Sequence, residues 1–256
     1  MKKIRDLQIR SKERLRDDYF LLKLTDKEPL PEMFPGQFVE INVERASEVF
    51  LRRPISINNY DASLNEMWLL IHEVGPGTIA LGQLNEGDYV NCVFPLGKGF
   101  SLDIEGENIL LVGGGVGTAP LLLYGKELKR RNKRVHFLLG GRSKRDLLQL
   151  DMFDSLGEVH VTTEDGSLGE TGYVTNHSIL TQVDFDFIAS CGPKPMMKAV
   201  AEYAEKLNIE CEVSLENLMA CGLGACLCCV EKTTTGNRCV CKDGPVFNIK
   251  ELLWHH

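Results

Sequence analysis

The chain has 256 residues, of which 43% are hydrophobic and 25% are charged, and its formal net charge is −7. These values are ordinary for a globular protein with a core of normal size, and the length allows two domains. The acidic balance argues against nucleic acid as a general partner, because phosphate binding needs a basic surface. No apolar stretch reaches the roughly 20 residues that span a bilayer, so we expect no membrane segment.

The N-terminal residues begin with charge and lack the apolar region of a signal peptide. They therefore predict a cytoplasmic protein, in a compartment where thiols stay reduced. The chain has nine cysteines, and seven of them lie from Cys211 onward. In a reducing compartment this clustering indicates a metal centre rather than disulfides.

Residues 1–100 contain short apolar or alternating runs separated by glycine and proline turns. Many short strands with frequent turns predict a β-barrel or a β-sandwich. The predicted strands cover residues 20–24, 37–43, 55–58, 67–74 and 89–94.

The pattern changes after Gly106. Residues 108–112 form a continuous apolar run, as expected of a strand buried on both faces. A predicted helix and a second buried strand follow and complete a βαβ unit. Because this alternation continues, the sequence predicts a doubly wound parallel sheet. The further predicted helices cover residues 120–131, 146–156 and 195–207, and the further strands cover 135–139, 159–163 and 185–190.

A glycine-rich turn joins the first buried strand to its helix. Its glycines are Gly113, Gly114, Gly115 and Gly117, followed by Thr118. Such a turn lets the backbone approach a phosphate at the N-terminus of a helix, although it also fits a tight structural turn. The spacing is not a strict G-x-G-x-x-G. The residues after the next strand also include no acidic residue in position to bind a ribose hydroxyl. A second candidate ligand-binding segment, residues 190–197, begins at the carboxyl end of another strand.

The C-terminal region carries the run Cys221-x4-Cys226-x2-Cys229 and further cysteines downstream. This spacing is the plant-type ligand pattern of a [2Fe–2S] cluster. Gly222 and Gly224 permit the tight turns of a loop that wraps a cluster. The fourth ligand is Cys239 or Cys241, and Cys228 is interpreted as a packed bystander. Zinc is the alternative, but zinc sites usually show paired knuckles separated by a longer loop.

Taken together, these motifs resemble the ferredoxin–NAD(P)H reductase superfamily. Its flavin and nucleotide motifs match residues 53–56, 77–78, 113–120 and 191–196, in that order. The cysteine-rich tail, at residues 214–230 and 241–247, closely resembles the electron-transfer subunits of dihydroorotate dehydrogenase B. The resemblance implies an FAD-binding antiparallel β-barrel at 1–100, an NAD-binding α/β domain at 101–213 and a small [2Fe–2S] domain at 214–256.

The resemblance also implies roles for individual residues. Flavin contacts would come from Arg53, Pro54, Ile55, Ser56, Leu70, Ile71, His72, Gly77 and Thr78. Arg53 would pair with the FAD pyrophosphate, whereas His72 is equally a simple strand residue. The turn at 113–118 and the segment after Cys191 would hold NAD, with Cys191 near the hydride path or only a small core residue. The family pattern favours Cys241 over Cys239, so the implied cluster ligands are Cys221, Cys226, Cys229 and Cys241.

The implied activity is electron transfer in pyrimidine (UMP) biosynthesis. A partner catalytic subunit containing FMN would oxidise dihydroorotate, and electrons would pass through [2Fe–2S] and FAD to NAD+, in a heterotetramer of two copies of each chain. One alternative is a ferredoxin–NADP reductase or sulfide dehydrogenase subunit, since Arg142 and Arg145 could meet a 2′-phosphate. A different class would be a zinc-binding regulator with a degenerate nucleotide fold.

Overall fold

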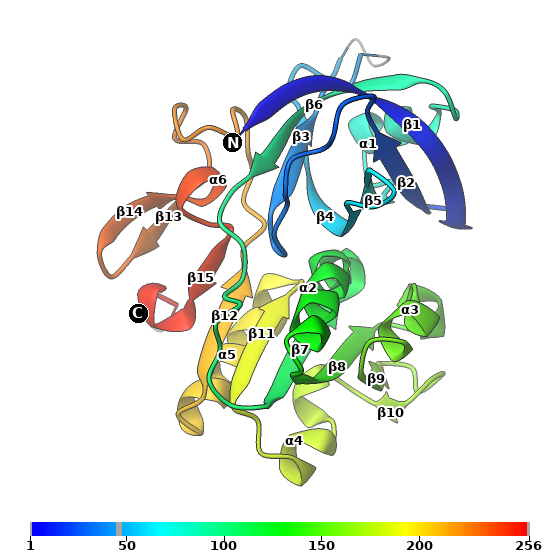
Figure 1. Cartoon of the computed structure of the whole chain (residues 1–256). Helices are drawn as coiled ribbons and strands as arrows, with labels where there is room; N and C mark the ends of the chain where they lie inside the picture. Colours follow the sequence, from blue (N-terminus) through cyan, green and yellow to red (C-terminus); the bar gives the residue numbers. More distant parts are fainter. Residues whose placement is uncertain (1, 45–47, 255–256) are drawn as a thin grey trace. The chain divides into compact units, whose positions relative to one another are not determined.

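A computed structural model describes residues 2–44 and 48–254 of the chain (Figure 1). Its contacts divide the chain into two compact units. The barrel unit comprises residues 1–99, 217–231 and 237–245, and the sheet unit comprises residues 100–216, 232–236 and 246–256. The tail that we predicted from residue 214 is therefore shared between the two units.

The barrel unit is built on a closed six-stranded barrel of order β1-β2-β5-β4-β3-β6, in which all neighbouring strands are antiparallel (Figure 1). This confirms the barrel and its five predicted strands. Its elements are β1 (Lys3–Arg16), β2 (Tyr19–Thr25), β3 (Phe38–Ile41), β4 (Arg53–Asp61), β5 (Glu66–His72), α1 (Pro76–Gly82) and β6 (Tyr89–Leu96).

The first strand, β1, was not predicted. It buries Leu7 and Ile9, but most of its other side chains are charged or polar and only partly covered. Few apolar residues mark it in the sequence, because only one of its faces meets the core. Pairing with both β2 and β6 closes the barrel and leaves this strand without a free edge.

The sheet unit contains a seven-stranded sheet of order β10-β9-β8-β7-β11-β12-β15. All its pairs are parallel except that of β12 with β15. The predicted doubly wound sheet is thus confirmed. Its strands are β7 (Asn108–Gly114), β8 (Arg134–Gly141), β9 (Glu158–Thr163), β10 (Glu170–Thr171), β11 (Phe187–Cys191), β12 (Glu210–Ser214) and β15 (Val246–Asn248).

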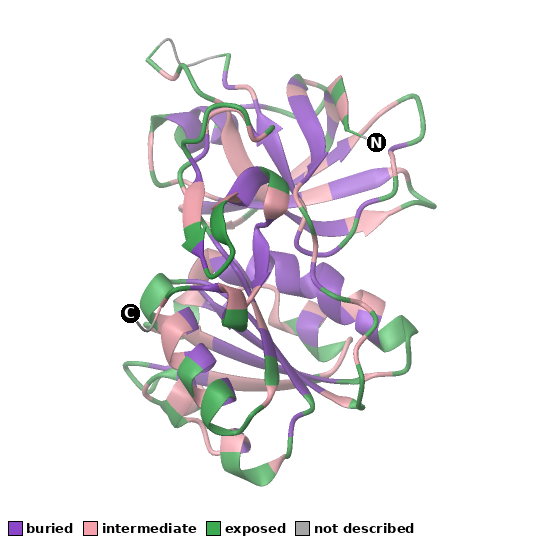
Figure 2. Cartoon of the chain, turned by 90° about the vertical axis from the view of Figure 1, so that its left-hand side faces the viewer, coloured by how far each residue is buried: buried purple, intermediate pink, exposed green. Residues whose placement is uncertain are grey.

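Helices pack on this sheet through apolar faces. The helices are α2 (Ala119–Arg130), α3 (Leu150–Asp154), α4 (Ile179–Gln182) and α5 (Lys194–Lys206), with short 3-10 turns η1 (Gly115–Thr118), η2 (Lys144–Asp146), η3 (Val174–Asn176) and η4 (Ile249–Glu251). Leu121, Leu122 and Leu128 form the predicted apolar side of α2 and are fully buried. Burial stabilises the fold by about 1.5–3 kcal/mol per leucine. Figure 2 shows the buried residues concentrated along the central strands.

The helix predicted at 146–156 is shorter in the structure. It forms only over α3, because Gln149 adopts a left-handed backbone conformation (φ 58°) immediately before the helix. The tail forms a hairpin of β13 (Val230–Thr233) and β14 (Gly236–Cys239), followed by α6 (Val240–Asp243).

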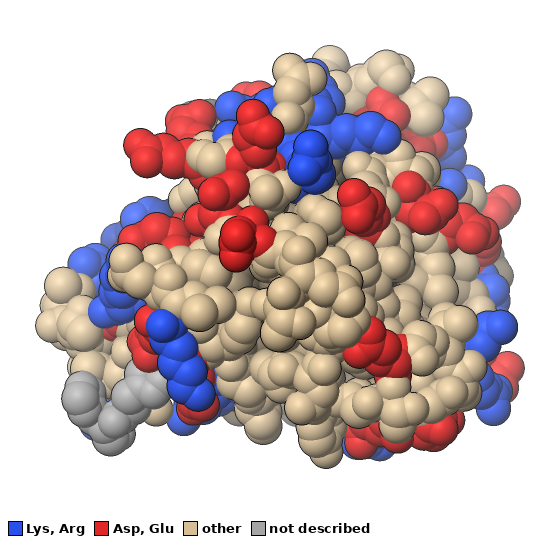
Figure 3. Space-filling model, turned by 90° about the horizontal axis from the view of Figure 1, so that it is seen from below, with Lys and Arg blue, Asp and Glu red and all other residues tan. Residues whose placement is uncertain are grey.

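Two further features are the distribution of charge on the surface and the length of the helices. On the face drawn in Figure 3, lysine and arginine side chains lie scattered among aspartate and glutamate rather than in one basic field. Among the described residues, no helix is long and apolar enough to cross a membrane.

Candidate functional site

The cysteine-rich loop of the barrel unit directs backbone N–H groups at its own sulfur atoms. Cys221 Sγ accepts hydrogen bonds from Leu223 N (3.3 Å) and Ala225 N (3.4 Å). Gly224 N donates to Cys241 Sγ at 3.1 Å. Amide donors around sulfur are the environment that an iron–sulfur cluster requires, because they stabilise negative charge on its thiolates.

The thiols of this loop meet in two pairs. Cys226 supplies the neighbouring thiol of Cys221, and Cys229 supplies the neighbouring thiol of Cys241. The Cys241 N–H also donates to Cys229 Sγ at 3.4 Å. Two thiols for each of two irons is the ligand arrangement of a [2Fe–2S] cluster, so the donor set fits that group.

The two remaining cysteines of the region are placed differently. Cys239 directs its thiol at the carbonyl oxygen of Gly224 (Sγ to O, 3.9 Å), and Cys228 is exposed. The geometry therefore favours Cys241 over Cys239 as the partner of Cys229, a choice that spacing alone left open.

The protonation of these thiols follows from their surroundings. Burial raises the pKa of Cys221, but N–H donors from Leu223, Cys226 and Ala225 outweigh it and lower the pKa to about 6. For Cys241, burial and the neighbouring Cys229 thiol raise the pKa to about 12. A bound metal would hold even this thiol as the thiolate.

A buried carboxyl group lies against the cysteine-rich loop. Glu40 on β3 is fully buried, and neither of its carboxyl oxygens has a hydrogen-bond partner within the described residues. Burial raises its pKa to about 7, against the opposing charge of Arg52. A Cβ atom at Gly222 would lie 2.9 Å from Glu40 Cγ, so the loop packs directly on β3. No motif in the sequence marks Glu40.

The predicted flavin motif occupies the start of β4, beside β3. In the register of the two strands, Glu40 faces Pro54 and Phe38 faces Ser56. The Arg53 side chain crosses the first turn of α1, because a Cβ atom at Gly77 would lie 2.6 Å from Arg53 Nε. Arg53 Nη1 donates to the carbonyl oxygens of two preceding residues, at 2.9 and 3.2 Å. Pro54, Ile55 and Ser56 are half-buried, which leaves part of each accessible to a ligand.

Four other predicted flavin residues pack or form hydrogen bonds within the barrel unit. His72 Nε2 lies 3.1 Å from Asp18 Oδ2, and its ring stacks on Tyr19 with 4.1 Å between centroids. Leu70 and Ile71 are fully buried in the barrel core. The hydroxyl of Thr78 closes the turn before α1, accepting from the N–H of Val74 at 3.0 Å.

In the sheet unit, the glycine-rich turn meets the segment after β11. The chain runs outward from β7 through β8 and β9, then returns to β11 and runs the other way, so the strand order reverses between β7 and β11. Ligands of open α/β sheets bind at such a point, at the carboxyl ends of the strands. A Cβ atom at Gly117 would lie 2.5 Å from Gly192 Cα, and one at Gly114 would lie 2.7 Å from Met196 Sδ. The two segments therefore pack with almost no side chain between them.

The other predicted residues of this turn contribute conformation. Gly113 is paired with Cys191 across the two strands, and Gly115 has a left-handed backbone (φ 57°). Thr118 donates its hydroxyl to the carbonyl of Gly115 at 3.0 Å. Cys191 is buried, and burial raises its pKa well above the ordinary value, so it is a neutral thiol. Its surroundings suit a packed side chain rather than a nucleophile.

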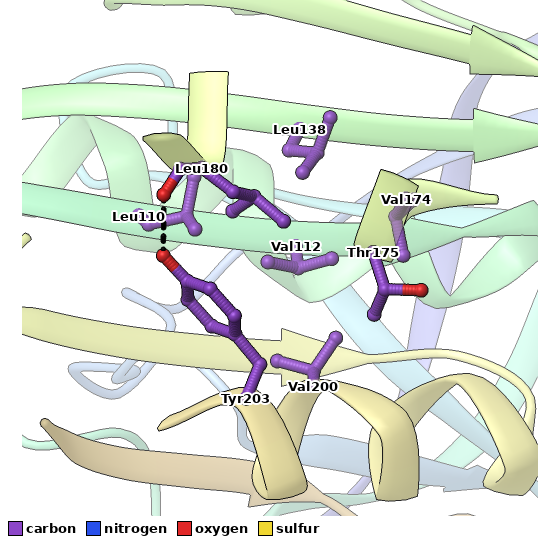
Figure 4. Close-up of a pocket in the computed structure, with 8 residues that line it drawn as sticks. All are labelled: Leu110, Val112, Leu138, Val174, Thr175, Leu180, Val200 and Tyr203. Carbon is purple, nitrogen blue, oxygen red and sulfur yellow. Dashed lines mark hydrogen bonds between the residues drawn. The ribbon is translucent and has the colours of Figure 1, made fainter. Parts of the chain in front are cut away.

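The sheet unit also contains a small cavity in its core. Figure 4 shows Tyr203 donating its hydroxyl to the carbonyl of Leu180, at 2.7 Å, among apolar side chains. Its volume of about 10 Å³ is at the lower limit for one water molecule, which excludes a cofactor.

The chain is a flavin- and pyridine-nucleotide-linked oxidoreductase of the ferredoxin reductase class. It is assigned to this class by its closed antiparallel barrel, its doubly wound sheet with glycines at the switch point and its loop of paired thiols. Residues 216–253 match the iron–sulfur cluster binding domain of dihydroorotate dehydrogenase B, and residues 111–202 match the oxidoreductase NAD-binding domain. The chain belongs to the family of dihydroorotate dehydrogenase B (NAD+) electron transfer subunits.

Relatives of that name cover most of the chain. The one from Caldanaerobacter subterraneus is 42% identical over 226 residues, which are 86% of this chain and 87% of the relative. The one from Listeria monocytogenes is 39% identical over 253 residues, 96% of this chain and 98% of the relative. A solved structure of an NADH-dependent reduced ferredoxin–NADP oxidoreductase is 30% identical, with a TM-score of 0.86 over 97% of this chain and 90% of that chain.

Proposed function

We propose that this chain is the electron-transfer subunit of an NAD-dependent dihydroorotate dehydrogenase. Electrons from a partner catalytic subunit containing FMN pass through a [2Fe–2S] cluster and FAD to NAD+, in the pathway to UMP. Family membership supports the reaction, and the two pairs of thiols with N–H donors are the observation that carries the electron-transfer role.

The cluster ligands in this proposal are Cys221, Cys226, Cys229 and Cys241. The amides of residues 223–225 stabilise negative charge on the sulfur atoms. The loop packs through Gly222 on β3, which pairs with β4, the strand of the flavin motif. One compact unit thus holds both the thiols and the flavin residues, as electron transfer between two bound groups requires.

In the barrel, Arg53 supplies positive charge for the FAD pyrophosphate, and Gly77 lets that side chain lie against the start of α1. Pro54, Ile55 and Ser56 present half-buried groups to the flavin ring. Leu70 and Ile71 support this site from the barrel core, and His72 and Thr78 lie at the end of β5 and in the turn before α1. FAD exchanges a hydride with NAD and single electrons with the cluster, which is why both groups are needed.

In the sheet unit, Gly113, Gly114, Gly115, Gly117 and Thr118 shape the NAD site. The glycines bring backbone N–H groups and the N-terminus of α2 within reach of the dinucleotide phosphates. Cys191 contributes a small, neutral side chain at the end of β11, next to Gly113.

The partner is a catalytic subunit containing FMN, in a heterotetramer of two copies of each chain. Three large apolar side chains near the thiols support an interface: Leu218, Leu223 and Leu227 are exposed. Exposed apolar groups gathered on one loop are typical of a protein–protein contact.

The test uses the purified chain, alone and co-expressed with a catalytic subunit. Alone, we expect flavin and iron–sulfur absorption and NADH oxidation with artificial acceptors, but no conversion of dihydroorotate to orotate. With the catalytic subunit, dihydroorotate should reduce NAD+. Orotate formation by the chain alone would disprove the subunit assignment, and a colourless protein containing zinc would support the alternative of a zinc-binding regulator.

A second candidate of the same class is a ferredoxin–NADP reductase type of subunit. It is favoured by the 30% identity and TM-score of 0.86 to the NADH-dependent reduced ferredoxin–NADP oxidoreductase. Faster turnover with NADPH than with NADH, and no coupling to a dihydroorotate-oxidising subunit, would select this candidate.

A further inference from the structure

A cluster of histidines lies on β8 and β9 of the sheet unit, which are neighbouring strands in Figure 1. His136 on β8 faces Glu158 on β9 in the parallel register. Glu158 and His160 are two residues apart on one strand, so their side chains share a face of the sheet. The sheet therefore brings two imidazoles and one carboxylate to the same place.

The distances between the three groups match those between ligands of one metal ion. His136 Nδ1 lies 3.3 Å from His160 Nε2 and 3.6 Å from Glu158 Oε2, and all three ligand atoms lie within 4.8 Å of one another. Tetrahedral zinc with bonds of about 2.0–2.1 Å separates its ligand atoms by about 3.4 Å. The two distances from His136 Nδ1 are thus close to the edge of a zinc tetrahedron, and the third pair lies within 4.8 Å.

A simple hydrogen bond between the imidazoles explains the geometry less well. The distance of 3.3 Å between the two nitrogens exceeds the usual 2.7–3.2 Å range of a nitrogen donor. His136 is almost fully buried, and its Nε2 has no hydrogen-bond partner among the described residues. The two contacts of His136 Nδ1, with His160 and with Glu158, are thus both longer than an ordinary hydrogen bond.

The charge state of the rings also suits a metal. Burial lowers the pKa of both His136 and His160, so both imidazoles are neutral at neutral pH. Neutral imidazole is the form that binds metal ions, and a neighbouring carboxylate supplies compensating charge. Glu158 is exposed, which leaves the cluster open to solvent on one side.

We propose that His136, Glu158 and His160 form a binding site for a divalent transition-metal ion of the zinc type, with water at the fourth position. Two imidazoles and one carboxylate are a common zinc donor set. Within the sheet unit, the site is separate from the nucleotide segments. His136 lies four residues before Gly140, which pairs with the glycine-rich end of β7, so about 13 Å of strand separates them.

The test is calorimetric titration with Zn²⁺ of the complete chain, loaded with flavin and cluster and dialysed against a chelator. Wild-type protein should bind one equivalent that His160→Ala loses. We expect affinity to fall at least about 100-fold, since loss of even an outer partner of a metal ligand weakens binding roughly 10–100-fold. Glu158→Gln should also weaken binding, and because Glu158 is exposed this variant tests the site without disturbing the core.

His177→Ala is the matched control. Its ring lies near His160, but His177 Nδ1 already accepts from Ile179 N at 3.0 Å and Nε2 faces Glu170 Oε1 at 3.6 Å. This variant should keep the Zn²⁺ affinity of the wild type. The proposal is overturned if wild type binds no such equivalent, or if His160→Ala and Glu158→Gln bind it as tightly as wild type does.

Discussion

At the residue scale, a single glycine fixes how closely two ligand-binding segments approach. A Cβ atom at Gly117 would lie 2.5 Å from Gly192 Cα and 2.6 Å from the carbonyl oxygen of Cys191. Both neighbours are backbone atoms that cannot rotate away. Gly117→Ala should therefore separate the segments and lower the unfolding free energy by about 1–3 kcal/mol. Steady-state kinetics with NADH and ferricyanide should show a raised KM for NADH.

The control for this change is Gly75→Ala. No atom lies within 4 Å of a Cβ at Gly75, and its φ of −164° is ordinary extended backbone. This variant should keep the wild-type KM. If Gly117→Ala also kept it, the close approach of the two segments would not matter for NADH.

Gly222 fixes how closely the cysteine-rich loop packs on the barrel in the same way. Its φ is +63°, and an added Cβ would lie 2.9 Å from both Glu40 Cγ and Leu96 Cδ1. In Gly222→Ala, strain of about 1–2 kcal/mol in the left-handed backbone adds to that clash. We expect iron and inorganic sulfide per chain to fall, as measured by metal and sulfide analysis. Gly236→Ala is the control, because Gly236 shares the positive φ (+107°) but meets no atom within 4 Å.

At the element scale, strand β12 carries a carboxyl group that responds to pH. Glu212 accepts from Ser101 N at 2.9 Å and from the Ser101 hydroxyl. Burial raises its pKa above 4.5, and the Ser101 hydrogen bonds only partly offset this. The folded state therefore holds the proton more tightly than the unfolded chain does. The stability contribution of Glu212 is present at low pH and is lost as pH rises through the folded pKa.

The variant that isolates this effect is Glu212→Gln, which cannot ionise. Urea unfolding at several pH values between 5 and 8 should show wild type losing stability relative to the variant as pH rises. Comparing the two proteins cancels the titration of every other group. A difference that grows in favour of wild type at high pH would contradict the assignment.

At the scale of the whole molecule, the apolar pattern predicted most of the architecture. Strands with continuous or alternating apolar runs, such as β7 at 108–114, were predicted because buried strand positions are occupied by apolar residues. Strand β1 was missed because its charged side chains are explained only by pairing with two neighbours. The backbone of Gln149, which shortens a predicted helix, has no marker in the sequence.

The candidate site was predictable to the extent that its chemistry is local. The spacing from Cys221 to Cys229 is enough to predict a cluster. Cys239 and Cys241 can be told apart only in the folded loop, where Cys241 Sγ accepts from Gly224 N and the Cys239 thiol points at the Gly224 carbonyl oxygen. Glu40 and the histidines of β8 and β9 come together only through strand pairing, so linear motifs do not reveal them.

A substitution in the cysteine-rich loop should abolish electron transfer through the cluster but preserve the oxidation of NADH by the flavin. Cys226→Ser removes one thiol of the first pair but touches neither the flavin strand β4 nor the glycine-rich turn. Assembled with the catalytic subunit, this variant should lose dihydroorotate-dependent reduction of NAD+, because electrons reach FAD only through the cluster. Its NADH–ferricyanide activity should stay within about twofold of wild type, less than roughly 0.5 kcal/mol of transition-state free energy.

Cys228→Ser controls for the loss of a thiol from the same loop. Cys228 is exposed and lies outside the two thiol pairs, so this variant should keep both activities and its iron. Equal loss in Cys226→Ser and Cys228→Ser would mean that the loop, rather than its paired sulfurs, carries the coupling. Retention of the dihydroorotate-dependent activity in Cys226→Ser would remove the cluster from the electron path.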